Sequence, residues 1–247
     1  MMRTIPDERY ASKPCQLLDW YLPDENGFDT ILWFHGGGME SGDRKGGAAL
    51  AEHAVKAGYA FVSVEYSMYP TARYPEFIVD AAQSVKYVQK RLPEVGGSGR
   101  IIVTGQSAGA YLTMMLCMNP AYLHNYGVEM EGILAFVADS AQQTVHYNVL
   151  RERGMDTRLE RLDDAAPMYY ACMNRVEKPL LIIYYENDFP CRPEQNILMY
   201  TSLKRFQPDA QIDITSLPGG HCAGSSHVDE TGEFPYMKAL LKFVKEL

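Results

Sequence analysis

The sequence predicts an α/β fold, built on a mostly parallel central sheet with helices on both faces. Short apolar runs alternate with amphipathic stretches along almost the whole chain, as expected of repeated strand–helix units. Several apolar runs are nearly continuous, such as IIV at 101–103 and LLII at 180–183. Strands of this kind are buried on both faces, as they are in a parallel sheet between two layers of helices.

The individual elements are predicted from hydrophobic periodicity and from the glycines and prolines that bound them. Gly58 ends the first helix, and Pro75 and Pro193 stand in the first turns of two later helices, where a missing N–H costs nothing. Strands are expected at 15–22, 30–36, 59–66, 100–105, 131–139, 178–186 and 210–218. Helices are expected at 48–58, 75–92, 107–118, 192–206 and 234–247.

Residues 140–177 interrupt this alternation. They contain VHYNVLRERGMDTRLERLDD, which is charged and helix-prone and stands between two predicted core strands. We expect a small cap-like insertion above the sheet rather than a second domain. The chain has no internal repeat and no low-complexity linker, so its 247 residues are expected to form a single domain over 1–247.

Composition argues against two classes of partner. The 31 acidic and 23 basic residues give a formal net charge of −8, and no Lys/Arg-rich run is present, which disfavours nucleic acid and anionic membranes.

The five scattered cysteines form no CxxC pair, which favours reduced thiols in a cytoplasmic protein. The first residues have no signal-peptide core, and no run approaches the ~20 apolar residues of a membrane span.

The strongest chemical motif is Gly105-Gln106-Ser107-Ala108-Gly109. It fits G-x-S-x-G and lies between a predicted strand and an apolar helix, the context in which a serine is presented as a nucleophile on a sharp turn. Small residues must flank the serine because that turn is tight. The serine hydroxyl then stands at a helix N-terminus, whose N–H groups favour developing negative charge.

A second motif, His35-Gly36-Gly37-Gly38, follows the apolar run TILWF. A glycine run lets the backbone approach a substrate closely and turn its N–H groups inward. In acyl transfer we expect Gly37 and Gly38 to form an oxyanion hole together with the N–H of Ala108. His35 is expected to be structural, since its neighbours supply the backbone groups.

A serine nucleophile needs a base, and the base needs an acid to orient it. The acid is expected at the end of a late strand, where KPLLIIYYEND offers Glu186 and Asp188. We favour Asp188, because it lies in the turn after the strand and can reach across the top of the sheet. Asp139, which follows the preceding strand, is the remaining candidate.

Two histidines, His221 and His227, lie in LPGGHCAGSSHVDE near the end of the chain. His221 comes just after the last predicted strand, behind two glycines that let the loop turn toward Ser107, and is predicted to be the base. His227 stands close to Asp229, and we expect it at the surface, near the closing helix. Cys222 is expected to be a small buried side chain.

Several segments together resemble the small esterase/lipase branch of the α/β-hydrolase superfamily: HGGG, GQSAG, ENDFPCRPEQ, LPGGH, LDWYLP at 18–23 and EYSMYPTARYPEFIVD at 65–80. That branch includes HGGG carboxylesterases, acetyl and feruloyl esterases, and kynurenine formamidase-like enzymes. The resemblance implies the α/β-hydrolase fold with an eight-stranded-type sheet, in which the short insertion at 140–177 comes before the acid-bearing strand. It also implies a catalytic triad of Ser107, Asp188 and His221, and no cofactor.

The chain departs from the usual pattern of that branch at a few positions. Met39 follows HGGG where an aromatic residue often stands, and Glu65-Tyr66-Ser67 replaces a common Asp-Tyr-Arg. Gln106 replaces the usual Asp or His of the serine motif. Met39 and Tyr66 are expected near the acyl or alcohol group, so both are candidate substrate-binding residues.

These features predict a serine hydrolase that cleaves carboxylic esters of small or short-chain acyl groups through an acyl-enzyme intermediate. The expected partner is a small-molecule ester, and a short acyl group is favoured because the insertion is too small for a large lid. An arylformamidase or a peptidase could use the same residues. A non-catalytic binder is disfavoured because the triad is complete, and a metal-dependent hydrolase because no HExxH motif is present.

Overall fold

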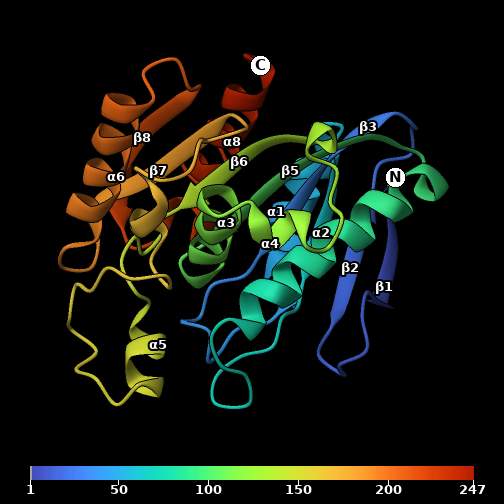
Figure 1. Cartoon of the computed structure of the whole chain (residues 1–247). Coiled ribbons are helices and arrows are strands. Elements are labelled where there is room, and N and C mark those ends of the chain that lie inside the picture. The colour runs from blue at the N-terminus through green and yellow to red at the C-terminus, as the bar shows by residue number, and fades with distance from the viewer. Residues whose placement is uncertain (1) are drawn as a thin grey trace.

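An eight-stranded, mostly parallel sheet forms the centre of the computed structural model, which describes residues 2–247 (Figure 1). The strand order is β1-β2-β4-β3-β5-β6-β7-β8. The β1–β2 and β2–β4 pairs are antiparallel, and the other neighbours are parallel. The strands are β1 Arg3–Arg9, β2 Leu17–Leu22, β3 Phe28–Phe34, β4 Ala60–Val64, β5 Gly97–Gln106, β6 Ile133–Asp139, β7 Leu180–Asn187 and β8 Ile212–Gly220.

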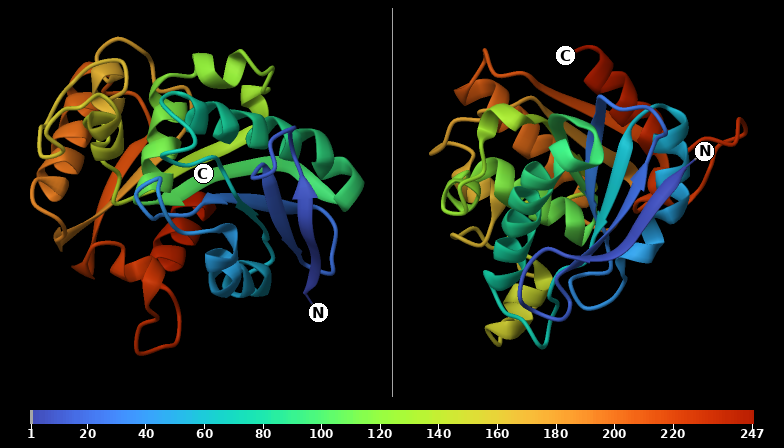
Figure 2. Two further views of the ribbon diagram at one scale, coloured as in Figure 1. Left: turned by 90° about the horizontal axis from the view of Figure 1, so that it is seen from below. Right: turned by 90° about the vertical axis from the view of Figure 1, so that its right-hand side faces the viewer.

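Helices cover both faces of this sheet. The left view of Figure 2 shows α2 and α3 on one side and α1 and α8 on the other. The α-helices are α1 Ala48–Lys56, α2 Glu76–Val95, α3 Ala108–Met118, α4 Ala121–His124, α5 Tyr147–Glu152, α6 Arg192–Phe206, α7 Ala223–Ser226 and α8 Pro235–Lys245. Short 3-10 turns lie at η1 Arg44–Gly47, η2 Met130–Gly132 and η3 Pro167–Tyr170. The predicted layered α/β architecture is therefore confirmed.

The hydrophobic core lies in two layers, one on each face of the sheet. All of β4 is buried, as expected of a strand covered on both sides. Every residue of α3 is buried as well, so this helix runs through the interior rather than over the surface. Its first residue follows Ser107 directly, and the serine motif is consequently anchored to a buried helix.

Most predicted elements match, and the differences have local causes. Strand β1 was not expected, because RTIPDER is charged, contains a proline and buries little of its surface at the sheet edge. Helix α2 runs past Pro93 to Val95 and ends at Gly96, whose φ of 93° is left-handed. Strand β8 continues through Pro218 to Gly220, so the last strand ends next to His221.

The segment 140–177 does not form a strand. It begins with a buried polar stretch at 140–146, continues into α5, and returns through η3 to β7. Its contacts tie it to the body of the fold: the hydroxyl of Tyr111 in α3 donates to the carbonyl of Ala165 at 2.7 Å. The hydroxyl of Tyr74 likewise donates to the carbonyl of Asp164 at 2.7 Å.

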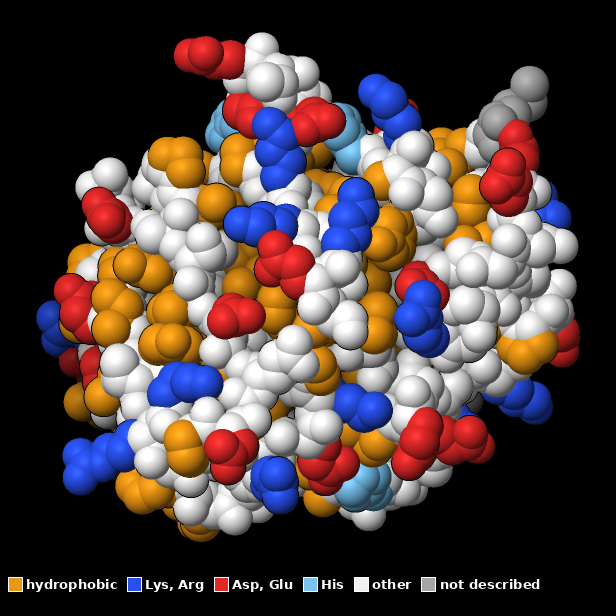
Figure 3. Space-filling model, turned by 90° about the horizontal axis from the view of Figure 1, so that it is seen from above, with side chains coloured by type: hydrophobic (Ala, Val, Ile, Leu, Met, Phe, Trp, Pro, Cys, Tyr) orange, Lys and Arg blue, Asp and Glu red, His pale blue; other side chains and the backbone are white. Residues whose placement is uncertain are grey.

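The surface is mixed in character. In the face seen in Figure 3, Lys and Arg side chains lie among Asp and Glu side chains, with apolar groups between them. Among residues 2–247, no helix is both long enough and apolar enough to cross a membrane.

Candidate active site

Ser107 occupies a sharp turn between β5 and α3. Its φ of 54° and ψ of −114° are unusual for a residue with a side chain, and its N–H donates to the carbonyl of Asp139 at 2.8 Å. A β-carbon at Gly109 would collide with the carbonyl groups of Phe34 and His35, and one at Gly105 would collide with Gly109. The two glycines are therefore required by close backbone contacts, as the motif predicted.

The predicted acid, base and nucleophile lie in one chain of hydrogen bonds. His221 Nε2 lies 2.8 Å from Ser107 Oγ, and His221 Nδ1 lies 2.6 Å from Asp188 Oδ1. Asp188 follows the end of β7 and His221 follows the end of β8, just as Ser107 follows the end of β5. All three therefore lie at the carboxyl ends of parallel strands. The structure thus brings together these three residues from distant parts of the sequence.

The surroundings of Asp188 favour its ionised form. Burial alone would raise the pKa of its carboxyl, but hydrogen bonds from His221 and Ser140, the positive charge on His221 when protonated, and the N–H of Phe189 outweigh burial and lower that pKa. The Asp188 side chain has no exposed surface, whereas His221 retains 18% exposure. The ring of Phe189 stacks on the imidazole with centroids 4.2 Å apart, and so covers one face of it.

The glycine loop lies beside the serine turn. A β-carbon at Gly36 would come within 3.3 Å of Ser107 Cβ, which shows how closely the two segments approach. Gly37 and Gly38 have left-handed φ values of 109° and 67°. Among the described residues, the N–H groups of Gly37, Gly38 and Ala108 donate no hydrogen bond. These three N–H groups are therefore not engaged within residues 2–247 of the protein.

His35 lies away from this chemistry, as expected. Its Nδ1 lies 2.7 Å from the carbonyl oxygen of Gly36, its Nε2 lies 3.0 Å from Glu65 Oε1, and its ring stacks on Tyr66. Tyr66 is fully buried and donates its hydroxyl to the carbonyl of His35 at 2.8 Å. Met39 is also fully buried. Neither side chain is therefore exposed to a substrate: Tyr66 packs against His35, and Met39 lies in the hydrophobic core.

Instead, α5 covers the glycine loop. A β-carbon at Gly38 would overlap the hydroxyl of Tyr147, and Asn148 donates from Nδ2 to the carbonyl of Gly38. Arg151, one turn later in α5, pairs with Glu40 at 2.5 Å and lies 5.7 Å from the ring centre of Tyr147. No sequence motif identifies these residues as part of the site. The sequence predicted only that their segment lies above the sheet.

The side chains of the alternative candidates do not join the hydrogen-bonded chain of Ser107, His221 and Asp188. Glu186 is exposed at the end of β7, and His227 is exposed just after α7. Asp139 is fully buried and accepts hydrogen bonds from Tyr185 at 2.8 Å and Ser225 at 2.6 Å. Burial, only partly offset by those two bonds, raises the pKa of its carboxyl to about 7.

Cys222 is buried next to the base, as expected. Burial raises the pKa of its thiol well above the usual value, so the thiol stays protonated. The five cysteines, Cys15, Cys117, Cys172, Cys191 and Cys222, are all free. Within residues 2–247, no group of three or more His, Cys, Asp or Glu side chains is arranged to hold a metal ion.

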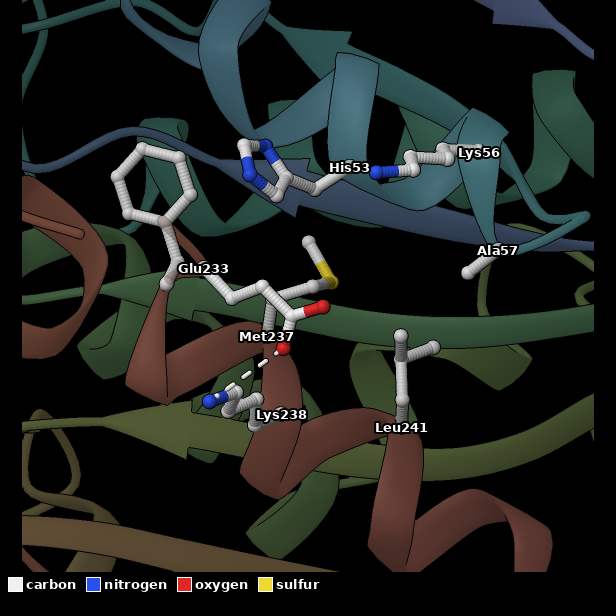
Figure 4. Close-up of a pocket in the computed structure, with 8 residues that line it drawn as sticks. His53, Lys56, Ala57, Glu233, Met237, Lys238 and Leu241 are labelled. Atoms are coloured by element: carbon white, nitrogen blue, oxygen red, sulfur yellow. Dashed lines mark ion pairs between the residues drawn. The ribbon is translucent and has the colours of Figure 1, made fainter. Parts of the chain in front are cut away.

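A separate groove of about 210 Å³ lies between α1 and α8 (Figure 4). It is lined by His53, Phe234, Met237 and Leu241, with Glu233 and Lys238 paired at its rim at 3.4 Å. None of the predicted site residues lines it. The groove is therefore distinct from the cluster around Ser107.

The fold and the arrangement around Ser107 define a protein of the α/β-hydrolase class. A family model described as BD-FAE matches residues 18–203, which is well over half of the chain. The chain therefore belongs to the BD-FAE family.

Individual relatives are similar to parts of this chain. Esterase LipI of Mycobacterium tuberculosis is 36% identical over 96 residues, covering 38% of this chain and 30% of LipI. The kynurenine formamidase of Danio rerio is 28% identical over 116 residues, covering 46% of this chain and 39% of that protein. The chain thus spans much less than two thirds of the length of these relatives.

The fold also matches solved structures over nearly its whole length. Esterase B from Lactobacillus rhamnosis, inhibited by a tributyrin phosphonate, superposes with a TM-score of 0.82 at 18% identity. The match covers 99% of this chain and 85% of esterase B. At this identity the likeness establishes the shared fold.

Proposed function

We propose that the protein is a serine hydrolase that cleaves carboxylic esters of short acyl groups. The observation that carries the proposal is the hydrogen-bonded chain from Ser107 through His221 to Asp188, with distances of 2.8 Å and 2.6 Å. This is the geometry that a serine needs to lose its proton as it attacks a carbonyl carbon. The names of the esterase relatives support the same activity.

In the first half of the reaction, Ser107 Oγ attacks the ester carbonyl and its proton passes to His221 Nε2. Asp188 stabilises the imidazolium that results and keeps the remaining proton on Nδ1. The N–H groups of Gly37, Gly38 and Ala108 hold the oxyanion, which needs donors that are not already engaged. His221 then donates its proton to the departing alcohol, leaving an ester between Ser107 and the acyl group.

In the second half, a water molecule replaces the alcohol. His221 takes a proton from the water, whose oxygen attacks the acyl-enzyme carbonyl, and the same N–H groups hold the second oxyanion. When the intermediate collapses, His221 returns the proton to Ser107 Oγ. The products are the free acid, the alcohol and the unchanged enzyme.

The preference for short acyl groups rests on α5. Tyr147 lies against Gly38, so it bounds the space beside one proposed oxyanion donor. Residues 140–177 are proposed to act as a small cap of a single domain rather than as a mobile lid domain. A formamide substrate is the second candidate, favoured by the likeness to a kynurenine formamidase.

The setting in which the enzyme works is also part of the proposal. We propose that it acts in the cytoplasm on a small-molecule ester and binds neither nucleic acid nor membranes. The free state of all five cysteines and the net charge of −8 support this.

The test compares the natural protein with Ser107→Ala on p-nitrophenyl acetate, butyrate and octanoate and on N-formylkynurenine. The natural protein should hydrolyse the short esters best, and the variant should lose about 10⁴-fold or more of kcat/KM. A fluorophosphonate probe should label only the natural protein. Undiminished ester turnover in folded Ser107→Ala contradicts the proposal, and faster turnover of the formamide than of every ester favours the second candidate.

A further inference from the structure

Ser140 lies at the junction between the proposed acid and base. Its Oγ donates to Asp188 Oδ2 and lies 2.9 Å from His221 Nδ1. His221 Nδ1 is therefore shared between Asp188 Oδ1 at 2.6 Å and Ser140 Oγ at 2.9 Å. Since the single hydroxyl proton points to Asp188, the serine oxygen can only accept from Nδ1–H.

The backbone of Ser140 is held by two neighbouring elements. Ser140 is fully buried and follows the end of β6 with a left-handed φ of 61°. Its N–H donates to the carbonyl of Ile183 in β7 at 2.9 Å. Its own carbonyl accepts from Arg192 Nη1 in α6 at 2.8 Å. Because this backbone is held and the side chain is buried, the hydroxyl has little freedom to turn away from Asp188 and His221.

The segment that follows Ser140 is held to α6 in the same way. Asn196 donates from Nδ2 to the carbonyl of Ala141 at 3.0 Å, and Gln143 donates from its N–H to Gln195 Oε1 at 2.8 Å. These buried hydrogen bonds resist displacement, because a shift of this segment against α6 would leave the bonded groups without partners. The start of the insertion is thus a rigid support beside the acid and base.

We propose that Ser140 is a positioning residue, which locks the Nδ1–H tautomer of His221 and shares the negative charge of Asp188. The proposal rests on the proposed function, since it concerns the same acid and base. Locking Nδ1–H leaves Nε2 as the acceptor for the Ser107 proton, which is the tautomer that the first step needs. Ser140 touches neither Ser107 nor the reacting carbonyl, so it acts through His221 and Asp188.

Removal of the Ser140 hydroxyl should change the pH dependence of turnover. The charged and titratable groups packed around this cluster are Asp188, His221, Arg192, Asp139 and Cys222. When the Ser140 hydroxyl is removed, Asp188 loses one hydrogen bond, and His221 Nδ1–H donates to Asp188 alone. A hydrogen bond to a carboxylate stabilises the imidazolium more than one to a neutral hydroxyl does. The acid limb of the kcat/KM profile should therefore move to higher pH.

The test measures Ser140→Gly, which keeps the left-handed backbone and loses the hydroxyl, with p-nitrophenyl butyrate as substrate. We expect kcat per active site to fall about ten- to a hundredfold, KM to change less than about twofold, and the acid limb to move upward. Ser140→Thr keeps the hydroxyl but strains the backbone, so it should melt lower than Ser140→Gly yet retain more kcat. Ser84→Ala removes another buried serine hydroxyl, bonded within α2 at 2.7 Å, and should match the natural protein.

Active sites are counted by the end point of fluorophosphonate labelling, so that misfolded protein does not enter kcat. Unchanged kcat and an unmoved acid limb in Ser140→Gly would overturn the proposal. So would a loss of kcat with an unmoved limb, because that pattern belongs to a structural role. Ester turnover that survives in Ser107→Ala would contradict the proposed function instead, so the two failures are distinguishable.

Discussion

The hydroxyl of Tyr147 occupies the space where a β-carbon of residue 38 would stand, so Gly38 and Tyr147 are in direct contact. The contact joins the cap segment to the glycine loop. It makes Gly38 indispensable for two reasons, since its φ of 67° is also left-handed. A substitution at either residue should therefore change the rate of ester hydrolysis.

Gly38→Ala should lower kcat about 10²- to 10³-fold, because the methyl group must displace Tyr147 or the loop that carries the proposed oxyanion donors. The assay is hydrolysis of p-nitrophenyl butyrate per labelled active site. Gly46→Ala is the matched control, because Gly46 has no atom within 4 Å of an added β-carbon and no left-handed φ. Equal activity in the two variants would show that the glycine loop does not hold the oxyanion.

Tyr147→Ala should shift the preference toward longer acyl groups, because it removes the ring that lies against Gly38. We expect the octanoate-to-acetate ratio of kcat/KM to rise about tenfold, a usual size for a change in an apolar pocket. The measurement is a chain-length profile on p-nitrophenyl esters. Tyr126→Ala, which alters an exposed tyrosine beyond α4, should leave the profile as it is. An unchanged profile in Tyr147→Ala would separate α5 from acyl selection.

His221→Ala should lower kcat about 10³- to 10⁵-fold, whereas His227→Ala should stay within about twofold of the natural protein. The reason is position: His221 Nε2 lies 2.8 Å from Ser107 Oγ, while His227 is exposed after α7. Steady-state turnover of a short ester is the measurement. A comparable loss in His227→Ala would mean that the base had been assigned to the wrong histidine.

Asp139 should make stability depend on pH. Its pKa rises from 3.8 to about 7 on folding, so the folded protein binds a proton that the unfolded chain has lost between these values. The stability that this bound proton adds to the folded protein is therefore fully present below about pH 4 and is lost as pH rises through about 7. In Asp139→Asn, urea unfolding should show a smaller loss of free energy between pH 5 and pH 8.

A second variant sharpens this test. Ser225 donates to the Asp139 carboxylate at 2.6 Å, a bond that lowers the pKa of that carboxyl. Ser225→Ala should consequently move the midpoint of the loss to higher pH. If natural protein and Asp139→Asn lose the same free energy over this range, Asp139 is ionised throughout it.

Much of the fold could be predicted because each core element carries its own signal. Helix α6 begins and ends where periodicity and Pro193 predicted, and the apolar run before Gly105 is a buried strand. The serine motif and the glycine loop were visible because a tight turn and a close backbone approach both demand particular residue types. Asp188 was a choice among acidic residues, and the sequence could rank them only by where the strand ends.

The rest depends on contacts between distant segments. Ser140 follows Asp139 at the end of β6, and a serine there has no special meaning until β7 and His221 stand beside it. Tyr147 and Asn148 belong to a charged stretch whose place over the glycine loop no local pattern indicates. Met39 and Tyr66 were expected at the substrate, but Tyr66 is buried against His35, and Met39 is buried in the hydrophobic core.

Strand β1 has a consequence for how separate molecules meet. It is the strand at one edge of the sheet, where unpaired N–H and C=O groups could pair with a strand from another copy. Pro6 removes one donor, the register shifts between Ile5 and Glu8, and Asp7 is paired with Arg44. An irregular and charged edge strand of this kind disfavours edge-to-edge aggregation. The features that hid β1 from sequence prediction therefore also disfavour pairing of this edge with another copy.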